Sequence, residues 1–150
     1  MMLIILDKDP VKAVELIPNK IKHKQLIELC QMLSTINDDG VYKLIKQGKA
    51  IMEWIKLHRS YVYAFAMQIC YWSLKNINIS LVSREKIFSI LKQFEMDLDT
   101  NYVIKTAIFR YQKEYTDTKY ATDSELPIDV AIEEYKRYVA WKKTKSERWK

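Results

Sequence analysis

Glycine and proline are scarce in this chain of 150 residues, which holds two glycines and three prolines. Strands joined by tight turns use both residues, because glycine supplies positive φ angles and proline fixes φ, whereas helix interiors avoid them. The scarcity predicts an all-α fold. The length suits a single domain with a substantial core over residues 1–150. We expect a compact bundle of about five to six helices, with a short strand or a packed arm at residues 1–6.

Histidine and cysteine are equally rare, with two of each. This number disfavours a histidine-based metal site or catalytic triad, and no Cys-x-x-Cys pair is present. Cys30 and Cys70 lie in apolar helical patterns, which is typical of core residues in a reducing compartment. The sequence predicts an intracellular protein without a metal or cofactor. Any chemistry would come from carboxylates, lysines, tyrosines or the terminal amine.

Long hydrophobic runs are absent too. The opening MMLIILDKDP lacks the basic leader of a signal peptide. The apolar stretch at residues 61–74 contains Gln68 and Ser73 and is shorter than the roughly 20 residues of a membrane span. We expect no contact with a membrane, and a central helix whose tyrosines and tryptophan belong to the core.

Apolar residues at helical spacing predict the helices of the first half. Asp9 and Pro10 are typical of a helix start, and Asn19 is the expected cap of the next helix. The turn sequence NDDG ends that helix. A further helical pattern covers residues 41–74, with a break near residues 47–49.

The second half shows the same periodicity. Ser83 is the expected N-cap of a helix over residues 85–96. Residues 103–111 predict another helix, and residues 114–127 an acidic loop. A last helix is expected to start near residues 127–129.

The chain is basic, with 25 Lys and Arg against 19 Asp and Glu and a formal charge of +6. Lysines and arginines attract phosphate, and indoles can stack on bases. The ending KRYVAWKKTKSERWK mixes both residue types and predicts a contact with DNA. The residues expected there are Trp141, Lys142, Lys143, Arg148 and Trp149. The alternative is a helix end whose cations complement the helix dipole and whose indoles pack on the core.

The segment NKIKHKQLIELCQMLST at residues 19–35 contains one acid, Glu28. At helical spacing, Lys20, Lys24 and Glu28 share a face opposite a leucine stripe, and Lys22 adds a fourth charge. A carboxylate beside ammonium groups on a phosphate-binding surface could act as an acid, a base or a stabiliser of positive charge. The alternative is a solvated Lys24–Glu28 pair worth under about 0.5 kcal/mol.

Four segments resemble a largely uncharacterised phage and viral family: LIILDKDPVKAVEL, NKIKHKQLIELCQMLST, AIEEYKRY and AWKKTKSERWK. Members open with an apolar run, Leu-Asp-x-Asp-Pro and Lys-Ala, and then a helix reading Asp-Lys-His, Leu-Glu and Ala-Gln-Leu-Leu-Ser-Thr. They end on a Trp-Lys-Lys…Trp stretch. That family is in turn distantly similar to the phage pyrimidine-dimer DNA glycosylases, which are compact helical enzymes. Glu28 falls where their essential glutamate lies.

This chain also differs from those glycosylases, and from the viral family, at residues that matter for the proposed chemistry. The glycosylases attack the sugar with the α-amine of a small residue exposed after Met removal, whereas here Met1 precedes a second methionine. The nucleophile would then be the Met1 amine or a lysine such as Lys20 or Lys24. Ile27 stands where the glycosylases have an arginine, and Ile21 where the viral family has a histidine.

The leading hypothesis is a viral DNA-binding protein that resembles a pyrimidine-dimer glycosylase/AP lyase, in which Glu28 assists base removal in the host cytoplasm. The second is a non-catalytic protein that coats or packages nucleic acid or forms part of a virion. The third is a metal-dependent nuclease that uses Glu28 with Glu85 or Asp97.

Overall fold

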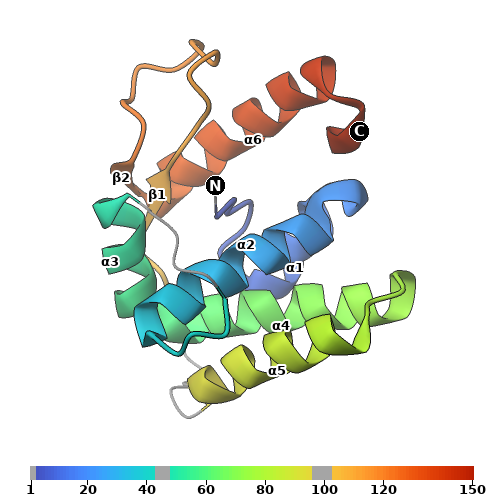
Figure 1. The fold of residues 1–150 in the computed structure, drawn as a ribbon. Helices are drawn as coiled ribbons and strands as arrows, with labels where there is room; N and C mark the ends of the chain where they lie inside the picture. Colours follow the sequence, from blue (N-terminus) through green and yellow to red (C-terminus); the bar gives the residue numbers. More distant parts are fainter. Residues whose placement is uncertain (1–2, 43–47, 96–102) are drawn as a thin grey trace.

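A computed structural model describes residues 3–42, 48–95 and 103–150. The α-helices are α1 (Pro10–Leu16), α2 (Asn19–Asn37), α3 (Lys49–Leu57), α4 (Arg59–Asn76), α5 (Leu81–Glu95) and α6 (Ile128–Lys145). Two strands, β1 (Thr106–Phe109) and β2 (Ser124–Pro127), form an antiparallel pair, and the 3-10 helix η1 (Glu147–Trp149) follows α6. The mostly helical fold is confirmed, and the strand pair is an addition to the expected all-α class (Figure 1).

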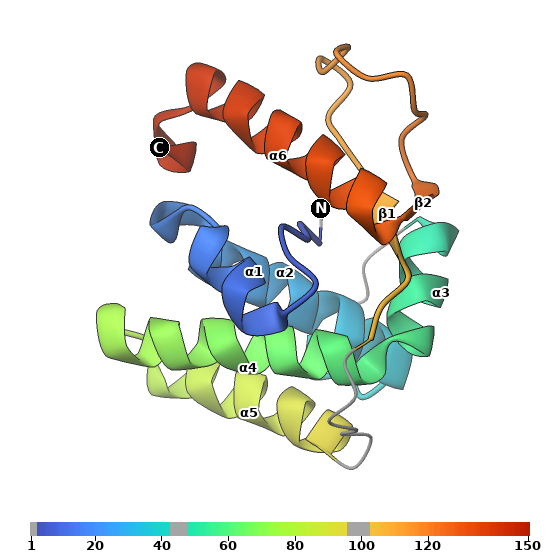
Figure 2. The ribbon, with the colours of Figure 1, turned by 180° about the vertical axis from the view of Figure 1, so that it is seen from behind.

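Helices α1, α2, α4 and α5 form a layer, and the C-terminal part of the chain lies on it. Helices α1, α2 and α5 all pack against α4 (Figure 1). The hairpin and α6 lie on the other side of α2, and seen from behind the arrangement is the same (Figure 2). Residues 3–6 form a packed arm rather than a strand, and all four side chains are buried. The Tyr61 hydroxyl on α4 donates to the Asp7 carbonyl at 2.9 Å and holds the end of the arm.

The helix starts follow capping chemistry, although two caps differ from those expected. The Asp9 carboxylate accepts from the Val11 N–H, as predicted. Asn19 is the first residue of α2, and its carboxamide oxygen accepts from the Lys22 ammonium instead of capping the helix. Helix α5 begins earlier than predicted, because the Ser80 hydroxyl takes the capping role expected of Ser83.

The long helical pattern over residues 41–74 is divided at His58, a position that the periodicity did not indicate. His58 has φ −122° and ψ 41°, outside helical values, and it separates α3 from α4. Its ring stacks on Trp54 with centroids 4.1 Å apart. Val41 and Tyr42 are not helical, and residues 43–47 lie outside the described residues.

The helix predicted over residues 103–111 is wrong, because this segment contains β1. Ala107, Ile108 and Phe109 are consecutive and all buried, since the strand lies between α3 and α6. A fully buried strand reads as a continuous apolar run, and periodicity alone does not separate such a run from a helix. The Trp54 indole donates to the Thr106 carbonyl, and the Tyr135 hydroxyl donates to the Ile108 carbonyl.

The expected apolar faces of α2, α5 and α6 do form the core. The buried residues of these faces include Leu26, Leu29, Cys30, Leu33, Ile87, Ile90, Leu91, Phe94, Ile132, Tyr135, Tyr138 and Val139. In α4 the prediction holds for Tyr61 but fails for Tyr71, whose side chain is 54% exposed. Cys30 and Cys70 are buried free thiols.

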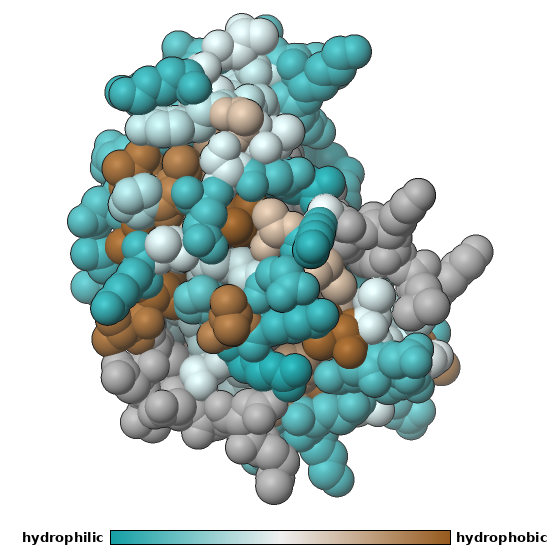
Figure 3. Space-filling view, turned by 90° about the vertical axis from the view of Figure 1, so that its left-hand side faces the viewer, coloured by the Kyte–Doolittle hydropathy of each residue, from teal (hydrophilic) through white to brown (hydrophobic). Residues whose placement is uncertain are grey.

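The surface combines polar residues with scattered apolar ones. On the side of the molecule that carries α3, apolar side chains gather in patches broken by hydrophilic ones (Figure 3). Exposed apolar residues include Leu57, Leu81 and Val103. None of the helices in the three described segments combines the length and the apolar character that crossing a membrane requires.

Candidate functional site

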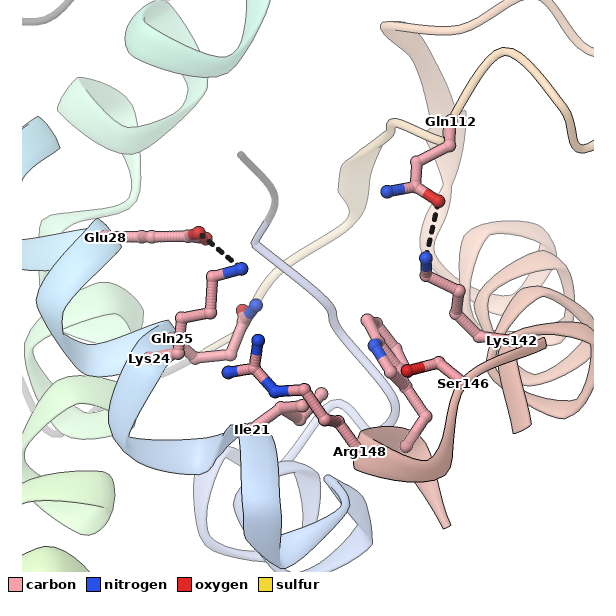
Figure 4. A pocket seen from close by; sticks show the side chains of 9 residues that line it. Ile21, Lys24, Gln25, Glu28, Gln112, Lys142, Ser146 and Arg148 are labelled. Atoms are coloured by element: carbon pink, nitrogen blue, oxygen red, sulfur yellow. Dashed lines mark hydrogen bonds and ion pairs between the residues drawn. The ribbon is translucent and has the colours of Figure 1, made fainter.

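A pocket of about 220 Å³ lies between α2 and the C-terminal end of the chain. Side chains from α2, from the loop after β1 and from the end of α6 with η1 point into it (Figure 4). The lining residues are Ile21, Lys24, Gln25, Glu28, Gln112, Lys142, Ser146, Arg148 and Trp149. The pocket therefore unites the charged face of the second helix with part of the basic, aromatic ending.

Helical spacing explains the α2 wall. Lys24 and Gln25 follow Ile21 by three and four residues, and Glu28 follows them by four and three, so all four project from one side of the helix. Leu29 and its apolar partners face the core instead. The amphipathic pattern that buries α2 thus also points these polar side chains toward the chain end.

The opposite wall forms because the chain reverses after α6. Ser146 has φ −142° and ψ 126°, and this extended residue ends the helix. The next turn, η1, returns Trp149 to the α6 surface, where its ring lies 6.1 Å from that of Tyr138 in an edge-to-face arrangement. Helix η1 also contacts α2. Trp149 is thus both a packed aromatic side chain and a wall of the pocket.

Cations dominate the lining. Lys24 Nζ lies 4.0 Å from Glu28 Oε1, and the Glu28 side chain is only 17% exposed. Lys142 Nζ donates to Gln112 Oε1 at 2.5 Å and lies 5.6 Å from the centre of the Trp149 ring. Within the described part of the chain, the structure gives neither Lys142 nor Arg148 a carboxylate partner. Three cations against one carboxylate leave the pocket with two uncompensated positive charges.

Two of the side chains that line the pocket are amides, and neither was predicted from the sequence. Gln25 is 6% exposed, and its Oε1 atom is buried without a hydrogen-bond partner among the residues described. The position of Gln25 between Lys24 and Glu28 was the feature of the sequence that could have indicated its place in the pocket. Gln112 comes from the loop after β1, and no pattern in the sequence links that loop to α2.

Lys20 and Lys22 are not brought to the pocket. Lys20 is exposed on the first turn of α2 and does not line the pocket. Lys22 is 5% exposed, donates to Asn19 and lies 5.1 Å from the centre of the Trp72 ring. Burial lowers the pKa of its ammonium group, although Glu15 opposes that shift. Lys22 thus packs against α4 rather than facing the chain end.

Two residues of the basic ending also lie elsewhere. Trp141 is half-buried against Tyr115 and Tyr138 and lines a neighbouring hollow. Lys143 is exposed beside a different, mostly apolar hollow that Lys136 also lines. Met1, the expected amine nucleophile, lies outside the described residues.

The residues expected for a metal-dependent nuclease do not form a ligand cluster in the described segments. No group of three or more His, Cys, Asp or Glu side chains that could hold a metal ion is found there. Glu85 is exposed on α5, and Asp97 lies outside the described residues.

The pocket combines groups suited to an anion that carries an aromatic ring. Lysine and arginine side chains supply charge-assisted donors, and an indole supplies a stacking surface. A mostly buried carboxylate next to an amine adds the capacity for proton transfer. The resemblance to the pyrimidine-dimer glycosylases stays a prediction. Comparisons of the chain with models of protein families, with curated proteins and with solved structures found no match.

Proposed function

We propose that this protein binds DNA and that the pocket between α2 and the C-terminal end contacts the polyanion. The observation that supports the proposal is the convergence of Lys24 with Lys142 and Arg148 beside the Trp149 indole. Cations on a phosphate backbone release counterions, which favours association at low salt, and the indole offers a face to a base.

The test is a salt titration of DNA affinity by fluorescence anisotropy. The double variant Lys142→Ala/Arg148→Ala removes both uncompensated cations, so we expect weaker binding and a salt slope reduced by about two. The matched control is Lys75→Ala/Lys92→Ala, which removes the same charge from exposed positions of α4 and α5 outside the pocket. The proposal is wrong if Lys142→Ala/Arg148→Ala keeps the affinity and salt slope of the parent protein, or if the control loses as much affinity as this variant.

A second proposal is that the protein is a glycosylase/lyase in which Glu28 assists base removal. It draws on one observation: Glu28 is the carboxylate of the lining, its side chain is 17% exposed, and the Lys24 amine lies 4.0 Å away. An amine would form a bond to C1′ of the sugar as the bond from C1′ to the base breaks. If the amine is that of Lys24, its ammonium first transfers a proton to the Glu28 carboxylate, so that the neutral amine can attack and the protonated Glu28 can give this proton to the leaving base. A proton on the new C1′–N group then moves to the ring oxygen as the C1′–O4′ bond breaks, and the sugar opens to a protonated imine.

Borohydride trapping on ultraviolet-irradiated and abasic duplexes tests this chemistry, because it reduces the imine to a stable protein–DNA adduct. We expect an adduct with the parent protein on both duplexes and a strongly reduced yield on irradiated DNA with Glu28→Gln. Lys24→Arg keeps the charge but removes the nucleophilic amine. Loss of the adduct in this variant assigns Lys24, and its persistence leaves the Met1 amine or another lysine such as Lys20. No adduct from the parent protein, together with salt-sensitive binding, would favour the non-catalytic alternative.

A further inference from the structure

We infer that the pocket receives the end of a DNA strand that carries a terminal phosphomonoester. The inference rests on the proposed DNA binding and is independent of any chemistry at Glu28. It names the part of the polyanion that the pocket fits best. Three properties of the lining support it: its net charge, its free donors and the position of the indole.

The net charge of the lining matches a phosphomonoester. Lys24 and Glu28 compensate one another, which leaves Lys142 and Arg148 as the uncompensated charges. A phosphomonoester has a charge of about −1.5 to −2 at pH 7, because its second pKa is about 6. An internal phosphodiester has a single negative charge. Two free cations in one pocket are therefore neutralised by a strand end and only half neutralised by an internal linkage.

The free donors fit the same group. The Arg148 guanidinium presents N–H groups in a planar fork that matches two oxygens of a phosphate. Lys142 uses one of its three ammonium protons on Gln112, so two remain for a ligand. Ser146 adds a hydroxyl to the lining. A terminal phosphate has three non-bridging oxygens to accept from these donors, whereas an internal one has two.

The indole adds a preference for the terminal nucleotide. Trp149 lines the pocket, and the Lys142 ammonium lies 5.6 Å from the centre of its ring. The last base of a strand has one face without a stacked neighbour, so an aromatic side chain can cover that face without opening the duplex. An internal base lacks a free face. One strand end thus supplies a dianion for the cations and a base surface for the indole.

Duplexes of one sequence that differ only at the strand end test the inference by competition anisotropy. The ends are a hydroxyl, a phosphomonoester at the 5′ or 3′ position, and the methyl ester of that phosphate, which has a single charge. We expect a phosphorylated end to bind roughly fivefold tighter than a hydroxyl end. The methyl ester should lose most of this preference, and inorganic phosphate should compete it away.

The variants separate this inference from general DNA binding. Lys142→Ala/Arg148→Ala should abolish the preference for phosphorylated ends, whereas Lys75→Ala/Lys92→Ala should keep it. Equal affinity for phosphorylated, methylated and hydroxyl ends, with salt-sensitive binding intact, would overturn the inference and leave the proposed function standing. No binding to any duplex would overturn both. A preference that survives in Lys142→Ala/Arg148→Ala would place the end-binding site elsewhere and so also reject the inference.

Discussion

Lys24 and Glu28 form an ion pair whose geometry limits its contribution to stability. The two atoms are 4.0 Å apart, and the Lys24 side chain is 56% exposed. Exposed pairs at this helical spacing contribute about 0.3 to 0.5 kcal/mol. Both residues also line the cationic pocket. Their part in the proposed binding of DNA is separate from this contribution to stability.

Lys24→Ala separates these two roles. We expect the free energy of unfolding, measured by urea denaturation, to change by less than about 0.5 kcal/mol. DNA affinity should fall, and its salt slope should decrease by about one, because the net charge of the lining falls from two to one. A variant that loses stability but keeps its DNA affinity would show that the pair has only a structural role.

Gln25 is a polar side chain at a buried position of α2. Its Oε1 atom is buried without a partner among the described residues, and an unpaired buried acceptor costs roughly 1 to 3 kcal/mol. We expect Gln25→Leu to raise the free energy of unfolding by about 1 kcal/mol and to weaken DNA binding. Thermal denaturation and anisotropy measure the two effects. A clear loss of stability would mean that the amide is already satisfied in solution.

At the scale of elements, one side chain joins α6 to the hairpin. The Tyr135 hydroxyl donates to the Ile108 carbonyl at 2.5 Å and accepts from the Arg110 N–H at 3.1 Å. Tyr135→Phe leaves both backbone groups without this partner, so we expect a loss of roughly 2 to 4 kcal/mol in the free energy of unfolding. Urea denaturation measures the loss. Tyr71→Phe, at an exposed position of α4, is the control and should cost under about 0.5 kcal/mol. Equal effects would contradict the proposed role of Tyr135.

Elements with one apolar face were predictable, and elements buried on both faces were not. The faces of α2, α5 and α6 were predicted because polar and apolar residues alternate at helical period. Strand β1 has no polar face to reveal its period, since α3 covers one side and α6 the other. The division at His58 escaped prediction because neither proline nor glycine marks it, and the stacking of the His58 ring on Trp54 is a contact of the folded chain.

The same distinction holds for the pocket. Its α2 wall followed from helical spacing, so Lys24 and Glu28 were correctly placed together. The reversal of the chain after Ser146 depends on tertiary packing of Trp149 on Tyr138, which no local pattern shows. The sequence therefore indicated the basic ending as a whole as a candidate contact surface. It did not separate Lys142 and Arg148, which line the pocket, from Lys143, which does not.

At the scale of the whole molecule, buried tyrosines make stability depend on alkaline pH. Burial raises the pKa of Tyr138 to about 12 and raises the pKa values of Tyr61 and Tyr135 further. Between pH 10 and these values the unfolded chain has lost phenolic protons that the folded chain keeps. The folded state then binds more protons, so the free energy of unfolding falls as pH rises. This contribution is fully present below about pH 10.

We expect urea denaturation to show a decline in the free energy of unfolding between about pH 10 and about pH 12, together with phenolate absorbance on unfolding. Tyr61→Phe should make the decline shallower by removing one such group. At neutral pH the same variant should cost about 1 kcal/mol, because its hydroxyl donates to the Asp7 carbonyl. A profile of the same steepness in this variant would contradict the assignment.

The walls of the pocket come from residues 21–28, from Gln112 and from residues 142–149, so the pocket exists only when distant parts of the chain have docked. During synthesis α2 emerges long before the second wall, and a nascent or partly folded chain has no complete cationic surface to offer. Occupancy of the pocket by a polyanion should in turn hold α6 and η1 against α2 and raise the melting temperature of the entire protein. We therefore expect DNA binding only from chains in which α6 and η1 are packed in their final positions.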